Sequence, residues 1–238
     1  ISFVINKETK EQVLSGLGEQ HLDVIVSKLK NKFGVEVDLS VPKVAYRETI
    51  RRKVEVEGKH KKQSGGHGQY GHVKIEFEPF DTQELIFEEK VVGGSVPKNY
   101  FPAVEKGLRE SCLTGVLAGY PTVDFKATVV DGSYHDVDSS EAAFMVAGSM
   151  AFKDAFKRGN SVILEPIMKV EVQVPDKYLG DVLGDLSRRR GNVIGTTLKN
   201  GNQTVEAEVP LAEMSGYVTD FRSLTQGRGD SSMEPCKY

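Results

Sequence analysis

Residues 167–198, IMKVEVQVPDKYLGDVLGDLSRRRGNVIGTTL, contain the pattern that decides the fold. Apolar and polar residues first alternate, which predicts a strand, and a helical spacing follows. To the end of the chain, the expected elements are strand 167–174, helix 177–187, strand 192–198, strand 203–209, helix 211–222 and a strand from about Asp230. The order βαββαβ is that of a ferredoxin-like α/β plait. We therefore expect residues 165–238 to form one such plait.

The first 42 residues predict a second, incomplete unit of the same kind. Two short strands precede a helix at 19–33, whose apolar residues recur at helical spacing up to Phe33, and Gly34 ends it. VEVDL (35–39) alternates as a further strand. This order is a plait that lacks its first strand and helix. Because the chain opens on Ile1, inside an expected strand, we expect it to be an excised fragment.

Residues 43–164 predict a larger α+β domain after a linker at Val41-Pro42. The expected elements are a long strand 44–58, a glycine loop, a strand through Val73, Ile75 and Phe77, a strand 85–92, a helix 99–114, a strand 122–130 and a helix to about Lys157. Asp138 and Glu141 have the spacing of a capping box at the start of that last helix. The fold class is therefore α+β, with two plaits flanking an elongated domain.

Composition is that of an ordinary globular protein, with 39% hydrophobic residues among 238. No apolar run approaches the roughly 18 residues that cross a bilayer, and no signal-peptide pattern opens the chain. Two distant cysteines, Cys112 and Cys236, indicate reduced thiols. We expect a cytoplasmic protein without a membrane partner.

Positive charge is concentrated although the net charge of the chain is −3. Between Arg51 and Lys74 there are seven Lys and Arg residues against two Glu, a local net of +5. The run 188–190 is a second basic point. Such runs are common on solvated faces, so the charge alone leaves RNA binding open.

The loop GHGQYGHV (66–73) fits the nucleotide-binding pattern G-x-G-x-x-G-x-V. A dinucleotide site requires a helix after the glycines, whereas an alternating strand follows here. No kinase catalytic motif and no P-loop accompany the loop, so we reject a nucleotide site. Two interpretations stay open: a flexible hairpin tip, and an RNA-contacting tip in which glycine amides, cations and the rings of His67 and Tyr70 face phosphates and bases.

A second polar stretch, DGSYHDVDSS (131–140), invites a metal interpretation. It lacks the closing glutamate of a calcium loop and the additional His or Cys of a zinc site, so we favour a capped turn. That turn places His135 at its outer end. We find no nucleophile, base and acid at a readable spacing, and therefore expect no catalytic residue, metal or cofactor in this chain.

Several long stretches of the chain resemble motifs of one protein family and occur in the same order. They are GLGEQHLDVIVSKLKNKFGVEV (16–37), QSGGHGQYGHV (63–73), LAGYPTVDFKATVVDGSYHDVDSSEAAF (117–144), GDVLGDLSRRRGNVIG (180–195) and DFRSLTQGRG (220–229). The chain resembles the C-terminal part of bacterial translation elongation factor G over essentially its whole length. The resemblance implies a partial third domain at 1–42, a fourth domain at 43–164 and a fifth at 165–238. The fourth would resemble a domain of a small-subunit ribosomal protein, with a left-handed βαβ crossover.

The resemblance also implies a function. The parent would be a monomeric, ribosome-dependent GTPase that promotes translocation of tRNA and mRNA, with GTP and Mg²⁺ bound in an N-terminal domain outside this chain. The fourth domain would enter the ribosomal A site, at the decoding centre of the small subunit. The fifth would face the factor-binding RNA of the large subunit.

The site residues implied by this resemblance lie at the tip of the fourth domain and in one turn of the fifth. The tip would consist of Ser64, Gly65, Gly66, His67, Gly68, Gln69, Tyr70, Ser133, Tyr134, His135 and Asp136, supported by Lys59, Lys61 and Lys62, and the fifth-domain contact would be Arg188, Arg189 and Arg190. His67 stands where translocating members usually have arginine. A paralogue with another ribosome-associated role therefore stays open, as does a stand-alone RNA-binding module.

Overall fold

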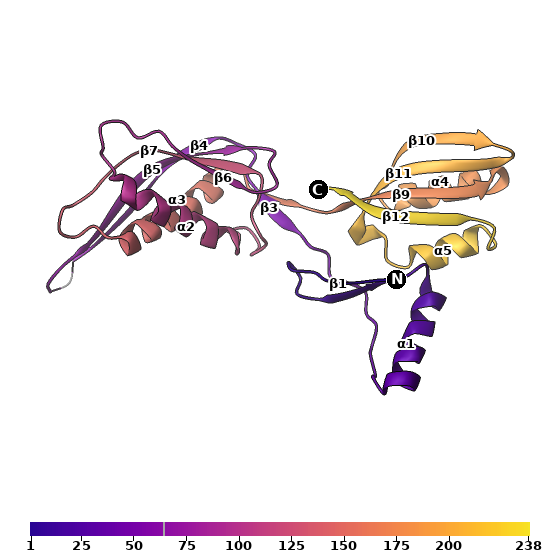
Figure 1. Cartoon of the computed structure of the whole chain (residues 1–238). Coiled ribbons are helices and arrows are strands. Elements are labelled where there is room, and N and C mark those ends of the chain that lie inside the picture. Colours follow the sequence, from indigo (N-terminus) through magenta and orange to yellow (C-terminus); the bar gives the residue numbers. More distant parts are fainter. Residues whose placement is uncertain (64) are drawn as a thin grey trace. The chain divides into compact units, whose positions relative to one another are not determined.

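The computed structural model describes residues 1–63 and 65–238. Contacts between residues divide the chain into two compact units, Tyr46–Leu164 and a unit composed of Ile1–Ala45 with Glu165–Tyr238 (Figure 1). This division does not separate the first 42 residues from the last part of the chain, so the three-domain boundaries stay a prediction.

The last part of the chain forms the predicted plait. Its elements are β9 (Ile167–Pro175), α4 (Leu179–Arg188), β10 (Asn192–Lys199), β11 (Asn202–Pro210), α5 (Tyr217–Leu224) and β12 (Asp230–Lys237). The four strands form one antiparallel sheet in the order β10-β11-β9-β12. The two central strands are the first and third in the chain, as the ferredoxin-like order requires. One face of β9 is buried through Met168, Val170, Val172 and Val174, which explains the alternation in its sequence.

Both helices of the plait begin differently from the prediction. Short 3-10 turns, Asp176–Tyr178 and Leu211–Glu213, precede α4 and α5. The expected helix over 211–222 is interrupted because Gly216 adopts a φ of 70°, in the left-handed region that a continuous helix cannot contain.

The N-terminal segment contains β1 (Ser2–Ile5) paired antiparallel with β2 (Gln12–Ser15), followed by α1 (Glu19–Phe33). Gly34 ends the helix with a φ of 65°, and its amide donates to the Lys30 carbonyl oxygen. The strand predicted at 35–39 was wrong. That segment pairs with no other strand of the described chain, and an alternating pattern forms a strand only where a neighbour supplies the hydrogen bonds.

Over its described residues, 46–63 and 65–164, the unit Tyr46–Leu164 contains a four-stranded sheet, two helices and a short strand pair. Its elements are β3 (Arg47–Thr49), β4 (Val54–Lys62), β5 (Gln69–Pro79), β6 (Leu85–Glu89), α2 (Phe101–Cys112), β7 (Phe125–Ser133), α3 (Glu141–Arg158) and β8 (Val162–Leu164), with a 3-10 turn at Lys98–Tyr100. The sheet order is β4-β5-β7-β6, and β3 pairs with β8. β6 and β7 are parallel neighbours joined through α2, so the predicted βαβ crossover is present; its left hand stays an expectation.

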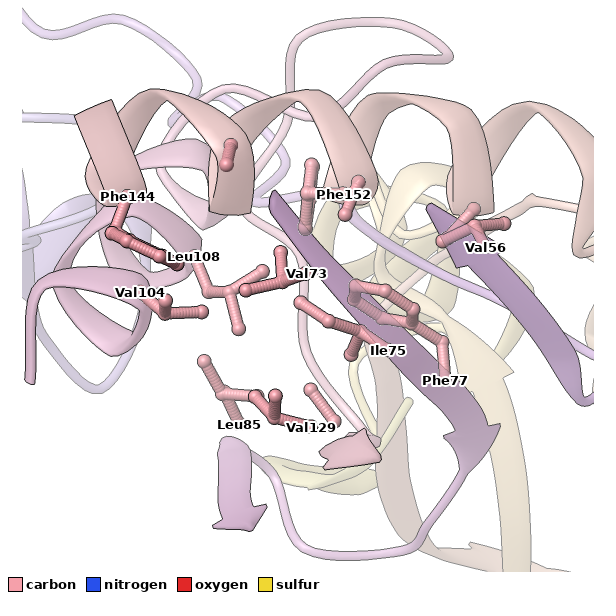
Figure 2. Close-up of a cluster of buried hydrophobic side chains, with 14 of the residues drawn as sticks. Val56, Val73, Ile75, Phe77, Leu85, Val104, Leu108, Val129, Phe144 and Phe152 are labelled. Atoms are coloured by element: carbon pink, nitrogen blue, oxygen red, sulfur yellow. The ribbon is translucent and has the colours of Figure 1, made fainter. Parts of the chain in front are cut away.

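The core of this unit lies between the helices and one face of the sheet (Figure 2). β5 contributes Val73, Ile75 and Phe77, all fully buried. α2 contributes Val104 and Leu108, and α3 contributes Phe144, Phe152 and Phe156. The fold is therefore mixed α+β, as predicted.

Two glycines allow α3 to lie directly on the strands that lead to the β4–β5 loop. A Cβ atom at Gly58 on β4 would lie 2.0 Å from the carbonyl oxygen of Ala147. At Gly71 on β5 it would lie 2.5 Å from the carbonyl oxygen of Ala143. Because real Cβ contacts are never this short, only glycine permits this approach of helix to sheet.

The long strand predicted at 44–58 was wrong as a single element. It is divided into β3 and β4, and the backbone turns at Ile50–Lys53 between them. There the amides of Arg51 and Arg52 both donate to the Gly159 carbonyl oxygen at 3.0 Å, instead of pairing along a strand.

The predicted cap of α3 was also wrong. Ser140 is the N-cap, and its hydroxyl oxygen accepts from the Ala143 amide at 3.2 Å. Asp138 instead contacts the β4–β5 loop.

Candidate nucleic-acid interface

The glycine loop is the connection of a β-hairpin. β4 and β5 pair from Val54 with Phe77 to Lys62 with Gln69, so the chain reverses between these last two residues. Gly65 and Gly66 have φ values of 36° and 136°, which L side chains rarely adopt. Ser64 lies outside the described residues. A strand, and not a helix, follows the glycines, so the loop lacks the helix N-terminus that a dinucleotide site requires.

The end of β7 and the turn after it lie beside this hairpin. Ser133 pairs with His72, and Tyr70 forms an isolated parallel bridge with Ser139. The Ser133 hydroxyl is 2.6 Å from the Tyr70 hydroxyl and 2.7 Å from His72 Nδ1. The structure therefore brings the two predicted tip segments together.

The turn also holds the loop through backbone groups. The Gly68 amide donates to Asp138 Oδ1 at 3.0 Å, and the Tyr70 amide donates to the Asp138 carbonyl oxygen at 2.9 Å. The Ser139 hydroxyl donates to the Tyr70 carbonyl oxygen at 2.8 Å. The expectation that the glycines expose their amides to a ligand was wrong for Gly68, because its amide is already bonded to a carboxylate.

His135 occupies the outer turn in a defined orientation. Its amide donates to the Ser139 hydroxyl oxygen at 2.9 Å. Its Nδ1 accepts from the amides of Val137 and Asp138 at 3.3 and 3.2 Å. Because Nδ1 acts as an acceptor, the ring proton lies on Nε2, which forms no hydrogen bond to a described residue. With its side chain 56% exposed, His135 can donate to an external acceptor.

Cations and rings surround these segments. Lys59, Lys61 and Lys62 are exposed along β4, and the Lys59 ammonium lies 6.0 Å from the centre of the Tyr70 ring. Gln69 is exposed, and its Oε1 is 2.8 Å from His60 Nε2. His67, Tyr134 and Asp136 are exposed as well. The surface thus presents ammonium groups, amide and imidazole donors and aromatic rings.

The three arginines of the contact predicted in the last part of the chain have different environments. Arg189 is buried, so its assignment as an RNA contact was wrong: its guanidinium donates to Asp185 at 3.0 Å, to Asp220, and to the carbonyl oxygens of Glu213 and Ser215. Its position four residues after Asp185, at the C-cap of α4, was the signal for this pairing.

Arg190 and Arg188 are more accessible. Arg190 pairs with Glu165 at 2.7 Å and with Glu213 at 2.9 Å, and these hydrogen bonds raise the pKa of its guanidinium. Arg188 pairs with Asp185, but its side chain is 71% exposed. Arg188 is therefore the member of the trio best placed to meet another molecule.

Sequence reasoning missed Asp138, Ser139 and His72 as parts of the tip. The available signal was the run DVDSS, because Asp and Ser side chains after a turn commonly bond nearby backbone groups. For His72 the available signal was strand alternation, which places it on the same face as Tyr70.

Within 1–63 and 65–238, no group of three or more His, Cys, Asp or Glu residues could hold a metal ion. Burial raises the pKa of the Cys112 thiol to about 12, so it is protonated at neutral pH and is a poor nucleophile. None of the described helices is long and apolar enough to cross a membrane.

Comparisons with known proteins show the family and the fold of this chain. Family models match residues 1–41 (Elongation Factor G, domain III), 42–160 (Elongation factor G, domain IV) and 162–238 (Elongation factor G C-terminus). A protein from Thermus thermophilus whose crystal structure is known is 46% identical in sequence to this chain. The two structures match with a TM-score of 0.86, over 99% of this chain and 35% of that protein. This chain therefore spans about a third of the length of that protein. The matched models are those of the third domain, the fourth domain and the C-terminus of the family. From residue 1 to residue 238, the chain belongs to the elongation factor G family of translation factors.

Proposed function

We propose that the protein promotes GTP-dependent translocation of tRNA and mRNA, and that the tip of the unit Tyr46–Leu164 enters the A site on the small ribosomal subunit. The observation that carries the proposal is the joining of the two tip segments, which places Gln69, His135 and three lysines on one exposed end of a narrow sheet. The rest of the tip would support this contact through Gly65, Gly66, His67, Tyr70, Ser133, Tyr134 and Asp136.

The chemistry of the tip suits contact with RNA of any sequence. Every codon passes through the A site, so a factor acting there must not discriminate between bases. Ammonium groups neutralise phosphates, and the Nε2–H of His135 and the Gln69 amide bond to sugar, phosphate or base acceptors. We infer that the tip blocks backward movement of tRNA by its position rather than by covalent chemistry.

The rest of the proposal concerns parts of the protein beyond this chain. We propose that GTP and Mg²⁺ bind in another domain of a monomeric, cytoplasmic protein. The glycine loop does not fit this nucleotide, because the Asp138 carboxylate occupies the position beside the Gly68 amide where a phosphate would bind. We further propose that Arg188 and Arg190 contact large-subunit RNA.

The test is to separate translocation from GTP hydrolysis in the whole protein. We expect Gln69→Ala and His135→Ala each to slow single-round translocation about tenfold, the effect of losing roughly one hydrogen bond to a charged partner. Ribosome-stimulated GTP hydrolysis should stay near the wild-type rate, since neither residue touches the nucleotide. Rapid mixing with fluorescent mRNA and radiolabelled GTP measures both steps.

A matched control is Gln173→Ala, which removes an exposed glutamine from β9 and should change neither rate. If hydrolysis fell in parallel with translocation, the assignment of the tip would be wrong.

A second candidate is a family member with another ribosome-associated role. It is favoured by His67, which replaces the arginine expected in translocating members and thereby removes a permanent charge from the tip. Growth of a strain depleted of its main factor distinguishes the two: rescue by this protein supports translocation, and failure of a folded, ribosome-binding protein to rescue supports the second role.

A further inference from the structure

Three parts of the tip converge on one residue, Asp138. Its carboxylate accepts from the Gly68 amide in the β4–β5 loop at 3.0 Å, and its carbonyl oxygen accepts from Tyr70 at the start of β5 at 2.9 Å. Its own amide donates to Nδ1 of His135 at 3.2 Å. Asp138 therefore connects the loop that leads into Gln69 with the turn that carries His135.

The loop fits closely around this carboxylate. A Cβ atom at Gly68 would lie 3.0 Å from Asp138 Oδ2 and 3.0 Å from the Lys62 carbonyl oxygen. A larger residue at position 68 would therefore require Asp138 or the Lys62 backbone to shift by a few tenths of an ångström. The Asp138 side chain is 24% exposed, so this bond is partly shielded from water.

The charge of Asp138 is unfavourable for the proposed partner. A carboxylate within a surface that binds phosphates repels them, so Asp138 weakens RNA binding if it acts only through charge. Asp138 can have a different role, in which its side-chain oxygen accepts a hydrogen bond from a loop amide. This role requires the oxygen atom and not the negative charge.

We propose that Asp138 is a positioning residue that locks the β4–β5 loop to the 134–139 turn, so that Gln69 and His135 meet RNA as one rigid surface. This inference rests on the proposed function. Without the lock, residues 65–68 keep two glycines at positive φ and lose their tie to the turn. RNA binding then has to order the loop, and this entropic cost weakens the contact.

The lock itself is tested by amide hydrogen exchange in the full 238-residue chain, followed by NMR. Asp138→Ala should accelerate exchange of the Gly68 amide about tenfold or more, the effect of losing a hydrogen bond to a charged group. Asp138→Asn keeps an acceptor oxygen in nearly the same volume and should retain most of the protection. Asp136→Ala removes the same charge from the same turn and should leave Gly68 protected.

The functional consequence is tested in the whole protein by single-round translocation. Asp138→Ala should slow it severalfold, Asp138→Asn should restore most of the rate, and GTP hydrolysis should be unchanged for both. An Asn variant as slow as the Ala variant, or an Ala variant with wild-type Gly68 exchange, would overturn the lock, since charge or another contact would then be responsible.

The failure of the lock and the failure of the proposed function give different results. If the lock is wrong, Gln69→Ala and His135→Ala still slow translocation whereas Asp138→Ala does not. If the proposed function is wrong, none of the three variants affects translocation, even when exchange at Gly68 is accelerated.

Discussion

Replacing Glu48 with alanine is expected to lower the free energy of unfolding of the unit Tyr46–Leu164 by about 3–5 kcal/mol. The Glu48 side chain is fully buried. Its Oε1 accepts from the Leu117 amide at 2.8 Å, and its Oε2 accepts from the amides of Ala118 and Tyr120 at 3.0 and 2.8 Å. The alanine variant leaves three amide donors without this acceptor and opens a cavity beside Gly115. Urea denaturation followed by circular dichroism measures the change.

The control for Glu48 is Glu110→Ala, which removes an exposed glutamate from α2 in the same unit. Surface substitutions of this kind change stability by about 0.5 kcal/mol or less. If the two variants had similar stability, the three amides would have found other partners and the buried carboxylate would not organise the 115–120 loop.

Replacing Arg189 with methionine is expected to destabilise the plait of the last 74 residues by about 3–5 kcal/mol, the usual cost of removing one partner of a buried ion pair. Methionine keeps much of the side-chain volume, so the loss is electrostatic. The Asp185 side chain, only 5% exposed, loses a buried cation, and the carbonyl oxygens of Glu213 and Ser215 lose a donor. Thermal and urea unfolding measure this change.

The neighbouring arginine supplies the comparison. Arg188→Met removes a cation that also pairs with Asp185, but from a side chain that is 71% exposed. Because the Arg188 guanidinium is open to solvent, we expect its removal to cost at most about 1 kcal/mol. Equal losses for the two variants would contradict the assignment of Arg189 to the interior.

Much of the plait could be predicted from sequence because its signals are local. β9 alternates over a buried face, the central strands are bounded by glycine and proline, and the helices have apolar residues at helical spacing. Residues 35–39 show the limit of such signals. They alternate as well as β9 does, yet whether they form a strand depends on a partner that no local pattern reveals.

The structure brings the two predicted loop segments together, but the sequence did not show how they are joined. In the motif G-x-G-x-x-G the glycines look equivalent, but in the structure glycine fits each position for a different reason. Gly66 supplies a positive φ, Gly68 makes room for Asp138, and Gly71 makes room for α3. These last two reasons involve segments about 70 residues away in the chain, so spacing within the motif could not show them.

The charged residues that matter for stability were the least predictable. Glu48 lies in the polar-looking sequence YRETI and gives no sign that its side chain is buried. The run 188–190 is uniformly basic, although one member is buried, one is paired twice and one is largely exposed. Composition reports charge, whereas only tertiary structure shows where the charge is neutralised.

The most direct measurement of the central claim is crosslinking from the tip in ribosome complexes. A cysteine introduced by His67→Cys, in a whole protein whose exposed Cys236 is changed to serine, carries a short photoactivated crosslinker. Asp81→Cys, exposed beyond the opposite end of β5, is the control position. We expect the tip position to crosslink to small-subunit RNA at the A site and to tRNA, and Asp81→Cys not to give these products. A tip position that forms no RNA crosslink while the protein is bound and hydrolysing GTP would contradict the account.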